Sequence, residues 1–323
     1  MKKTIQLDDI AKRAIEMYDL DVREITFLLE ETNIFYKVLD HAGQQYALKI
    51  FQTESSTLED NKAEIFFMNI IRKSQHVSLP NVYIGKNGDE IQLVETIDSD
   101  IPKRVALYSW IEGEDLDGNE NEARYEQFGE LTALLHQATI DVNIPPEIKP
   151  KKWDEVFYYR HEKPVYKETI YQRFLDDDYH NVMDKIIPFL NKKLANYYED
   201  HLKNVRLIHG DLNPWNVKVE NEKMHILDFE DALLGLPIHD FATMLYYYQD
   251  QDDYANIKKC FFNGYQKISQ LPVFTDYDID LLITARRVNY LNYVLLVDDD
   301  PQKFIEENMK KVHLFLNKYQ ITL

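Results

Sequence analysis

Apolar and polar residues alternate with a two-residue period along much of the chain up to residue 110, a pattern typical of half-buried strands. Strands are expected at residues 24–29, 34–39, 45–51, 83–85, 91–95 and 105–110. The dipeptide Asn87-Gly88 predicts a type I′ hairpin between the two strands around it. Apolar residues at helical spacing predict helices over residues 8–18 and 58–73. This part is expected to form an antiparallel sheet of about five strands with one packed helix.

The hydrophobic period becomes helical beyond residue 115. Helices are expected over residues 124–138, over most of 153–203, and over 241–319 with breaks at 271–272 and 298–301. Three prolines predict a loop at residues 143–152. Short apolar runs at residues 207–208, 217–219 and 224–227 predict small strands, with a turn at Asn221-Glu222. The pattern indicates an α+β chain, divided into a sheet-rich part at residues 1–110 and a mostly helical part at 111–323.

A lysine interrupts the apolar pattern of the third strand. Lys49 shares one face of that strand with Ala47 and Phe51, and a lysine at such a position is costly unless its ammonium group finds a partner. Glu64 lies on the apolar stripe of the next helix, so its carboxylate is expected to point toward the core. We predict an ion pair between Lys49 and Glu64. A lysine that reaches out to solvent, beside an unrelated glutamate, explains these two residues equally well when they are taken alone.

Composition narrows the class of protein. The chain has 323 residues, of which 45% are hydrophobic, so it is long and apolar enough to bury a full core. Its net charge of -19 argues against nucleic acid or an anionic membrane as the main partner. The single cysteine, Cys260, excludes an intrachain disulfide and a zinc cluster built on several cysteines. No signal-peptide or membrane-spanning stretch is visible, and a cytoplasmic location is expected.

Polar residues cluster at the ends of the short strands between residues 207 and 230. Asp211 precedes Asn216 with four residues between them, and Asp228 follows the predicted hairpin. Phosphoryl transfer from ATP uses one carboxylate to accept the proton of the attacking hydroxyl group, and an amide and a second carboxylate to hold Mg²⁺. The spacing therefore predicts a phosphotransferase site. The alternative, that these residues only cap turns, requires three independent coincidences.

The segment HGDLNPWN followed by ILDFED resembles the catalytic loop and metal motif of the aminoglycoside phosphotransferase / choline kinase-like superfamily. This resemblance implies a two-lobed protein-kinase-like fold. Residues 1–110 would form a nucleotide-binding lobe with an antiparallel sheet and a helix. Residues 111–323 would form a mostly helical lobe with catalytic and substrate-binding residues. The turn at residues 30–36 departs from the protein-kinase pattern, because it contains no glycine to cover the phosphates.

The resemblance also implies roles for individual residues. Asp211 would be the catalytic base, and Asn216 and Asp228 would bind Mg²⁺. Lys49, held by Glu64, would contact the phosphates of ATP. By position, the backbone of Ser109 and Ile111 would bind the adenine, although an ordinary exit from strand to loop explains these two residues equally well. The resemblance further implies that Asp240 braces the catalytic loop, that His209 supports this loop by hydrogen bonding, and that residues 111–115 form the hinge.

The sequence gives less information about the identity of the acceptor. Candidate residues are the run Tyr246-Tyr247-Tyr248, the acids Asp250, Asp252 and Asp253, and the pair Arg286-Arg287. Tyrosines with acids suit an amine, whereas an arginine suits an acceptor that carries a carboxylate. For most of these residues we favour an ordinary role in packing or at the surface. The C-terminus lacks the acidic tail of the aminoglycoside 3′-kinases, which argues against antibiotic inactivation.

These observations predict an ATP- and Mg²⁺-dependent kinase that phosphorylates a hydroxyl group of a small molecule. The expected acceptors are an amino sugar, an amino alcohol or a related metabolite. The acidic chain would favour a cationic acceptor, but an acidic surface that serves only solubility explains the net charge somewhat better. Two alternatives remain: a protein Ser/Thr kinase of the stress-response type, and a catalytically silent nucleotide-binding protein. The intact set of Lys49, Asp211, Asn216 and Asp228 argues against the silent protein.

Overall fold

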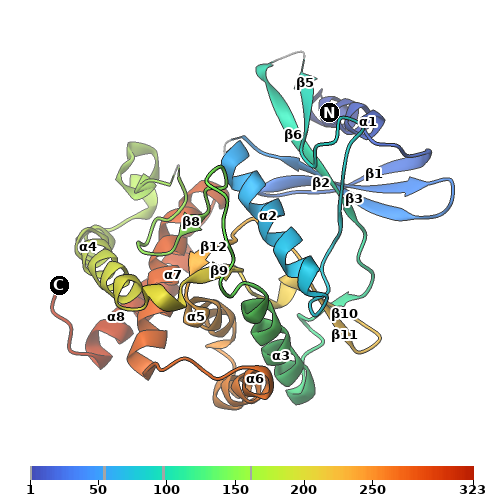
Figure 1. The fold of residues 1–323 in the computed structure, drawn as a ribbon. Helices are drawn as coiled ribbons and strands as arrows, with labels where there is room; N and C mark the ends of the chain where they lie inside the picture. Colours follow the sequence, from blue (N-terminus) through green and yellow to red (C-terminus); the bar gives the residue numbers. More distant parts are fainter. Residues whose placement is uncertain (1, 54–55, 97–98, 161) are drawn as a thin grey trace. The chain divides into compact units, whose positions relative to one another are not determined.

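The computed structural model describes residues 2–53, 56–96, 99–160 and 162–323 (Figure 1). The chain forms two compact units. Unit 1 consists of Met1–Leu116, Ile144–Lys149 and Asn216–Glu230. Unit 2 consists of Asp117–Asn143, Pro150–Trp215 and Asp231–Leu323. Unit 1 is built around an antiparallel sheet and unit 2 is mostly helical, so the predicted α+β fold is confirmed.

The large sheet of unit 1 has six strands, all paired antiparallel. The strands are β1 (Val22–Glu30), β2 (Asn33–Asp40), β3 (Gln45–Phe51), β4 (Val82–Tyr83), β5 (Gln92–Thr96) and β6 (Ser99–Ser109). Their order is β1-β2-β3-β6-β4, with β5 also paired to β6. Strand β3 is therefore central, and its side chains alternate between two buried faces.

Two helices of unit 1 complete this core. Helix α1 (Lys2–Glu16) contributes to a buried cluster with one face of the sheet, whose members include Ile10, Ala14, Ile34, Val38, Leu48, Ile50 and Leu107. Lys49 alternates with Leu48 and Ile50 and therefore faces the other way. Helix α2 (Leu58–Ser74) runs beside the sheet (Figure 1). It begins at a capping box in which Thr57 and Asp60 satisfy each other's backbone N–H groups.

The prediction of a β-hairpin around Asn87-Gly88 is wrong. Strands β4 and β5 each pair with β6 and not with each other. The turn is closed locally, because the Gly85 N–H donates to the Asp89 carbonyl (2.8 Å). The buried Gln92 side chain donates to Asn87 Oδ1 (2.9 Å) and to the Asp89 carbonyl (2.6 Å). This side chain fills the space where a hairpin ladder would form, an arrangement that strand periodicity does not reveal.

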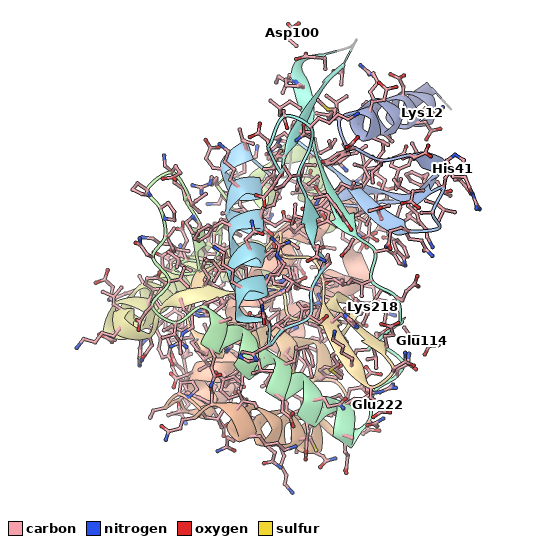
Figure 2. All side chains as sticks on the ribbon, turned by 45° about the vertical axis from the view of Figure 1, so that its right-hand side comes forward. Lys12, His41, Asp100, Glu114, Lys218 and Glu222 are labelled. Carbon is pink, nitrogen blue, oxygen red and sulfur yellow. The ribbon has the colours of Figure 1, made fainter. Side chains whose placement is uncertain are left out.

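A second, small sheet of unit 1 carries the end of the predicted motif. It has the order β11-β10-β7 and is formed by β7 (Glu114–Asp115), β10 (Val217–Glu220) and β11 (Lys223–Ile226). Asn221 and Glu222 at its turn both have positive φ, 46° and 71°, as a type I′ turn requires. Figure 2 shows Glu114, Lys218 and Glu222 on this sheet, and Lys218 pairs with Asp115 at 2.9 Å. The predicted small hairpin is confirmed.

Unit 2 consists mainly of helices. They are α3 (Glu122–Ala138), α4 (Asp177–Asp200), α5 (Pro237–Tyr248), α6 (Tyr254–Ile268), α7 (Asp276–Val297) and α8 (Gln302–Lys318). A three-stranded sheet lies among them, formed by β8 (Lys151–Lys152), β9 (Arg206–Ile208) and β12 (Leu233–Gly235). The breaks expected near residues 271 and 298 fall between α6 and α7 and between α7 and α8, as predicted, but the break at residues 249–253 between α5 and α6 was not predicted.

The prediction of helix over most of residues 153–203 is wrong for the first part of that range. Only α4 is an α-helix there, preceded by the short 3-10 helices Val165–Lys167 and Thr169–Phe174; His161 lies outside the described residues. The buried rings of Trp153, Tyr158 and Tyr166 hold this segment in an irregular path. Pro164, directly before the first 3-10 helix, lacks the N–H group that a continuous helix would need.

Helices α3 and α6 approach each other at two glycines. A Cβ atom on Gly129 would lie 1.9 Å from the Phe261 carbonyl oxygen, and one on Gly264 would lie 1.8 Å from the Glu126 carbonyl oxygen. No side chain larger than hydrogen fits at either position, so the two backbones are in direct contact. In the described part of the chain, no helix is both long enough and apolar enough to span a membrane.

Candidate active site

Lys49 is the centre of a buried ion group in unit 1. Its Nζ is surrounded by three carboxylate oxygens: Glu64 Oε1 at 3.0 Å, Asp228 Oδ1 at 3.4 Å and Glu230 Oε2 at 3.4 Å. Burial would lower the pKa of Lys49, but these carboxylates, Glu64 first, raise it well above its ordinary value. The ammonium group is therefore charged, and the predicted pair between Lys49 and Glu64 is present.

Packing fixes both members of this pair. Lys49 is 2% exposed on β3, and Glu64 lies on the buried stripe of α2. Glu64 Oε1 also accepts a hydrogen bond from the Tyr108 hydroxyl (3.3 Å) on β6. On the same helix, the Phe67 ring meets the Phe229 ring edge to face at 5.5 Å. Phe229 follows Asp228 directly, so this contact holds the metal motif against α2.

Glu230 is a member of this ion group that sequence reasoning missed. Its two carboxylate oxygens accept hydrogen bonds from the Thr32 hydroxyl (2.9 Å) and from the Asn33 side-chain amide. Burial and the neighbouring Asp228 raise the pKa of Glu230 to about 7, although Lys49 opposes the shift. The only signal in the sequence is its place two residues after Asp228.

Asn216 and Asp228 lie at the same end of the β10–β11 hairpin. Val217 pairs with Ile226, and the Leu227 N–H donates to the Asn216 carbonyl (2.8 Å). Asp228 has a positive φ of 51°, which is strained for a residue other than glycine and is often found at functional sites. Its side chain is 35% exposed, so its carboxylate is open to a ligand.

The donor set at this end of the hairpin fits a hard divalent cation. It provides a carboxylate and an amide oxygen, and Mg²⁺ typically takes one or two carboxylates and completes its shell with water and substrate phosphates. Among the described residues there is no group of three or more His, Cys, Asp or Glu side chains placed to hold a metal alone. A cation at Asn216 and Asp228 would therefore need oxygen ligands from a bound phosphate.

Ser109 is the final residue of β6, and Ile111 lies two residues beyond this strand. The Ser109 N–H donates to the Asn81 carbonyl (2.8 Å), and the Asn81 N–H donates to Ser109 Oγ (2.8 Å). In this arrangement the Ser109 N–H is already used and cannot bind a nucleotide. Ile111 is half-buried beyond the strand. The expected adenine contacts remain a prediction for both residues.

Asp211 lies in unit 2, at the end of β9. Its Oδ1 accepts hydrogen bonds from Arg286 Nη2 (2.5 Å) and from the Tyr247 hydroxyl (3.2 Å). Its Oδ2 accepts a hydrogen bond from Asn213 Nδ2 (2.8 Å). Helices α5 and α7 thus supply two of the partners, and the loop itself supplies the third. The carboxylate is held from both sides.

Arg286 is 2% exposed and has a dense set of polar partners. Its guanidinium donates to the hydroxyls of Tyr158 and Tyr290, the latter at 2.7 Å, and its Nη2 lies 3.6 Å from Asp231 Oδ2. Burial would lower the pKa of Arg286, but the tyrosines and Asp211 raise it well above its ordinary range. The guanidinium is therefore a fixed positive charge beside Asp211.

Asp240 braces the loop that carries Asp211, as the resemblance implied. Its carboxylate accepts hydrogen bonds from the backbone N–H groups of His209 (3.0 Å) and Gly210 (2.8 Å), and His136 Nε2 lies 2.9 Å away. Burial alone would raise the pKa of Asp240, but His136 and the Gly210 N–H lower it. Helix α5 begins at Pro237, so Asp240 lies inside its first turn and does not cap it. As expected, His209 supports the loop, because its Nδ1 accepts from the Asp211 N–H (3.3 Å).

Two of the acceptor candidates lie beside the predicted base. Tyr247 and Arg286 both bind Asp211 directly. The neighbouring Arg287 does have a structural role, since it donates to the side chains of Asn308 and Gln249. Asp250 forms an exposed ion pair with a lysine of α8, as expected of a surface acid. Helical spacing alone does not show which of two adjacent arginines faces the site.

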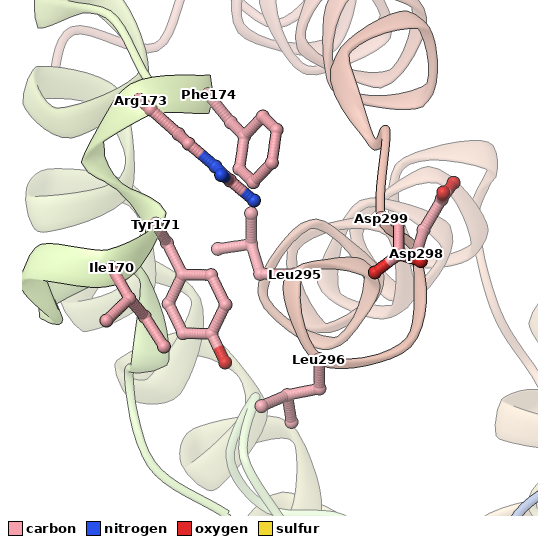
Figure 3. Close-up of a pocket in the computed structure, with 8 residues that line it drawn as sticks. All are labelled: Ile170, Tyr171, Arg173, Phe174, Leu295, Leu296, Asp298 and Asp299. Atoms are coloured by element: carbon pink, nitrogen blue, oxygen red, sulfur yellow. The ribbon is translucent and has the colours of Figure 1, made fainter.

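A separate cavity of about 240 Å³ lies between the second 3-10 helix and the C-terminal end of α7 (Figure 3). It is lined by Ile170, Tyr171, Arg173, Phe174, Leu295, Leu296, Asp298 and Asp299. None of the predicted site residues lines it. Its lining combines apolar side chains with one arginine and two acids, and it lacks the carboxylate and amide groups of the motif.

Comparison with known proteins agrees with this chemistry. The sequence profile of a family described as the phosphotransferase enzyme family matches residues 27–269. No curated protein matches the sequence at a significant level.

Among solved structures, an amicoumacin kinase in complex with AMP-PNP, Ca²⁺ and Ami is similar. It has a TM-score of 0.77 and 18% identity over 97% of this chain and 96% of the other. A microcompartment-associated aminopropanol kinase has a TM-score of 0.75 and 18% identity over 97% and 98%. A spectinomycin phosphotransferase has a TM-score of 0.60 and 12% identity over 95% and 93%. At these identities the likeness concerns the fold.

Proposed function

The chain belongs to the phosphotransferase enzyme family and is an ATP-dependent small-molecule kinase, and from this premise we propose that its acceptor is the hydroxyl group of an amine-bearing compound. The observation that carries the proposal is the environment of Asp211. Its carboxylate is hydrogen-bonded and held in place, and it lies among aromatic rings and a second acid.

The nucleotide is assigned to unit 1. The buried Lys49, oriented by Glu64, provides a fixed positive charge for the phosphates of ATP. Ser109 and Ile111 are assigned to the adenine. Asn216 and Asp228 would hold a divalent cation, with Mg²⁺ as the proposed ion, which would neutralise the charge that develops on the transferred phosphoryl group.

Asp211 is assigned as the catalytic base. We expect its carboxylate to accept the proton of the acceptor hydroxyl while that oxygen attacks the γ-phosphorus and the bond to the β-phosphate oxygen breaks. Arg286 and Tyr247 both bind Oδ1, and Asn213 binds Oδ2. These contacts set the direction of the carboxylate before the acceptor arrives, which lowers the cost of reaching the reactive geometry.

An amine on the acceptor is favoured by charge and by the surrounding rings. Asp211 and Asp231 place two carboxylates near one guanidinium, Arg286, which leaves an excess of negative charge. Trp215 is 50% exposed and meets the Tyr247 ring at 5.0 Å, a surface suited to a cation–π contact. Because Arg286 is already paired with Asp211, it offers less to a carboxylate-bearing acceptor. The similar aminopropanol kinase is named for an acceptor with both groups.

The test is Mg²⁺-dependent ADP release from ATP across a panel of hydroxyl acceptors, with Asp211→Asn as the control. The panel pairs each amino alcohol with the matching diol or deaminated alcohol, and it includes choline, homoserine, aminoglycosides and a protein substrate. We expect activity with an amino alcohol or amino sugar, lost by a factor of roughly 10² or more in Asp211→Asn. Equal activity with the deaminated compounds would refute the proposal that the acceptor carries an amine. Full activity of Asp211→Asn would refute the assignment of Asp211 as the catalytic base.

The metal assignment has its own test. Asp228→Ala should weaken the binding of Mg²⁺-ATP and leave the binding of adenosine unchanged, because only the phosphates carry the metal. Calorimetric titration of the purified protein measures both affinities. Unaltered affinity for Mg²⁺-ATP would contradict the role of Asp228.

A further inference from the structure

Three hydrogen-bond donors of unit 1 converge on one carboxylate, that of Glu230. The Thr32 hydroxyl donates to Oε1 (2.9 Å), and the Asn33 side-chain amide donates to Oε2. Lys49 Nζ lies 3.4 Å from the same Oε2. A hydroxyl, an amide and an ammonium group that meet at an anion are the donor types that proteins use to bind phosphate.

The turn between β1 and β2 is built to aim two of these donors. Asn33 is 3% exposed, and its Oδ1 accepts a hydrogen bond from the Gln52 N–H (3.3 Å), so its NH₂ group faces Glu230. The Gln52 side chain donates to the Glu31 carbonyl (2.8 Å), and the Glu31 N–H donates to the Asn33 carbonyl (2.9 Å). These bonds stabilise the turn without a glycine and use side chains where a glycine-rich turn would use backbone N–H groups.

The charges around Lys49 indicate that Glu230 is a replaceable occupant. One ammonium group has three carboxylates within 3.4 Å, so the negative charges exceed the positive charge. Glu64 has a structural role on α2, and Asp228 is assigned to the metal. Glu230 has no other assigned role, and the groups that donate hydrogen bonds to its carboxylate could bind a phosphate group in its place.

We propose that Thr32, Asn33 and Lys49 form a binding site for a phosphate group of the nucleotide, and that the Glu230 carboxylate fills this site in the nucleotide-free protein and leaves when the nucleotide binds. The inference rests on the proposed function, because it takes ATP as the ligand. The Glu230 side chain then competes with the nucleotide. The observed association constant for the nucleotide equals the intrinsic constant multiplied by the fraction of molecules in which Glu230 has left the site.

The first experiment measures ATP binding by calorimetry in the presence of EDTA, so that any effect of Glu230 on a metal does not enter. Glu230→Gln removes the competing charge while keeping the shape of the side chain. We expect it to tighten metal-free ATP by about tenfold or more and to leave adenosine unchanged. Glu31→Gln is the matched control: it removes one acid from the same turn, and its side chain is exposed.

The second experiment tests the donors. Thr32→Val removes the hydroxyl at nearly constant volume and should weaken Mg²⁺-ATP by about tenfold without affecting adenosine, because a hydrogen bond to a charged group is lost. Thr26→Val is the matched control on the neighbouring strand β1, where the hydroxyl donates to the exposed Glu24 side chain (3.1 Å).

Each outcome supports or overturns the proposal. Metal-free ATP bound equally or more weakly by Glu230→Gln would show that Glu230 does not occupy the phosphate site. A loss in Thr32→Val no larger than in Thr26→Val would remove Thr32 from the site. A wild-type protein that binds neither ATP nor Mg²⁺-ATP would refute the proposed function itself, and the inference would fall with it.

Discussion

Arg286 Nη2 lies 2.5 Å from Asp211 Oδ1, so the proposed base is in direct contact with a buried arginine of α7. In the sequence, this arginine is one of an adjacent pair for which an ordinary role is favoured. The structure separates the pair: Arg286 binds the carboxylate, and Arg287 binds two amide side chains. Adjacent positions on one helix thus serve two different parts of unit 2.

Arg286→Met should lower kcat by about 10- to 100-fold and leave the affinity for nucleotide nearly unchanged. The reason is that Asp211 would lose the donor that fixes its direction, and misplacement of a reacting group costs rate more than ground-state binding. Arg286→Lys should recover part of the rate, because it keeps the charge but not the planar set of donors. Steady-state kinetics and nucleotide titration provide the two readouts.

The control for this prediction is Arg287→Met, which removes the neighbouring arginine without a contact to Asp211. It should lower stability and change kcat much less. Equal losses of kcat in the two variants would show that Arg286 acts only through the general packing of α7.

The Lys49–Glu64 pair should show a strong energetic coupling. Both side chains are buried, so Lys49→Met leaves the Glu64 carboxylate without its ammonium partner, whereas the double variant leaves no charge at either position of the pair. We expect a double-mutant cycle of Lys49→Met and Glu64→Gln to give a coupling of about 2 kcal/mol in the free energy of unfolding. Urea unfolding of the four proteins measures it. Additive effects would mean that Asp228 and Glu230 satisfy Lys49 without Glu64.

Glu162 should make the stability of unit 2 depend on pH. Burial raises the pKa of Glu162 to about 8, although its hydrogen bond from Asn289 opposes the shift. Between the unfolded value of 4.5 and about 8, the folded protein keeps a proton that the unfolded chain has lost. This group therefore makes the protein less stable as pH rises through that range.

Glu162→Gln removes this titration while keeping an oxygen acceptor for Asn289. The variant should gain stability over the wild type as pH rises from 5 to 8.5, by up to a few kcal/mol, because each tenfold change in a protonation equilibrium is worth roughly 1.4 kcal/mol. Urea unfolding at the two pH values tests this, with the exposed Glu147→Gln as the control. A difference between variant and wild type that does not change with pH would contradict the prediction.

Gly264→Ala should destabilise the protein by about 2–4 kcal/mol, because its Cβ atom would lie 1.8 Å from the Glu126 carbonyl oxygen and the two helices would have to separate. The higher helix propensity of alanine, worth about 1 kcal/mol, does not offset this clash. Asn263→Ala on the same helix, away from this contact, should be neutral or slightly stabilising. Thermal unfolding of both variants tests the prediction, and equal melting temperatures would refute it.

The parts of the fold set by local pattern were predictable. The alternation around Lys49, the helical stripe of Glu64 and the turn at Asn221-Glu222 each follow from a few neighbouring residues, and the structure has them in the expected elements. The wrong predictions depend on contacts distant in sequence or on side chains that replace backbone pairing. Gln92 fills a turn through its side chain, and buried aromatic rings hold the segment after Trp153 out of a helix.

The same distinction applies to the candidate site. Lys49 and the motif that carries Asp211 were visible because their spacing is short and regular. The contacts of Tyr247, Arg286 and Glu230 were not predictable, because they depend on which face of a helix or loop turns toward a partner far along the chain. No local pattern carries that information.

The boundary between the two compact units falls at the peptide bond between Trp215 and Asn216, inside the eight-residue motif itself. The proposed base thus belongs to the same unit as Tyr247 and Arg286, and the proposed metal ligands belong to the unit whose sheet carries Lys49. Acceptor preference can therefore change through substitutions in one unit while the nucleotide machinery of the other keeps its sequence.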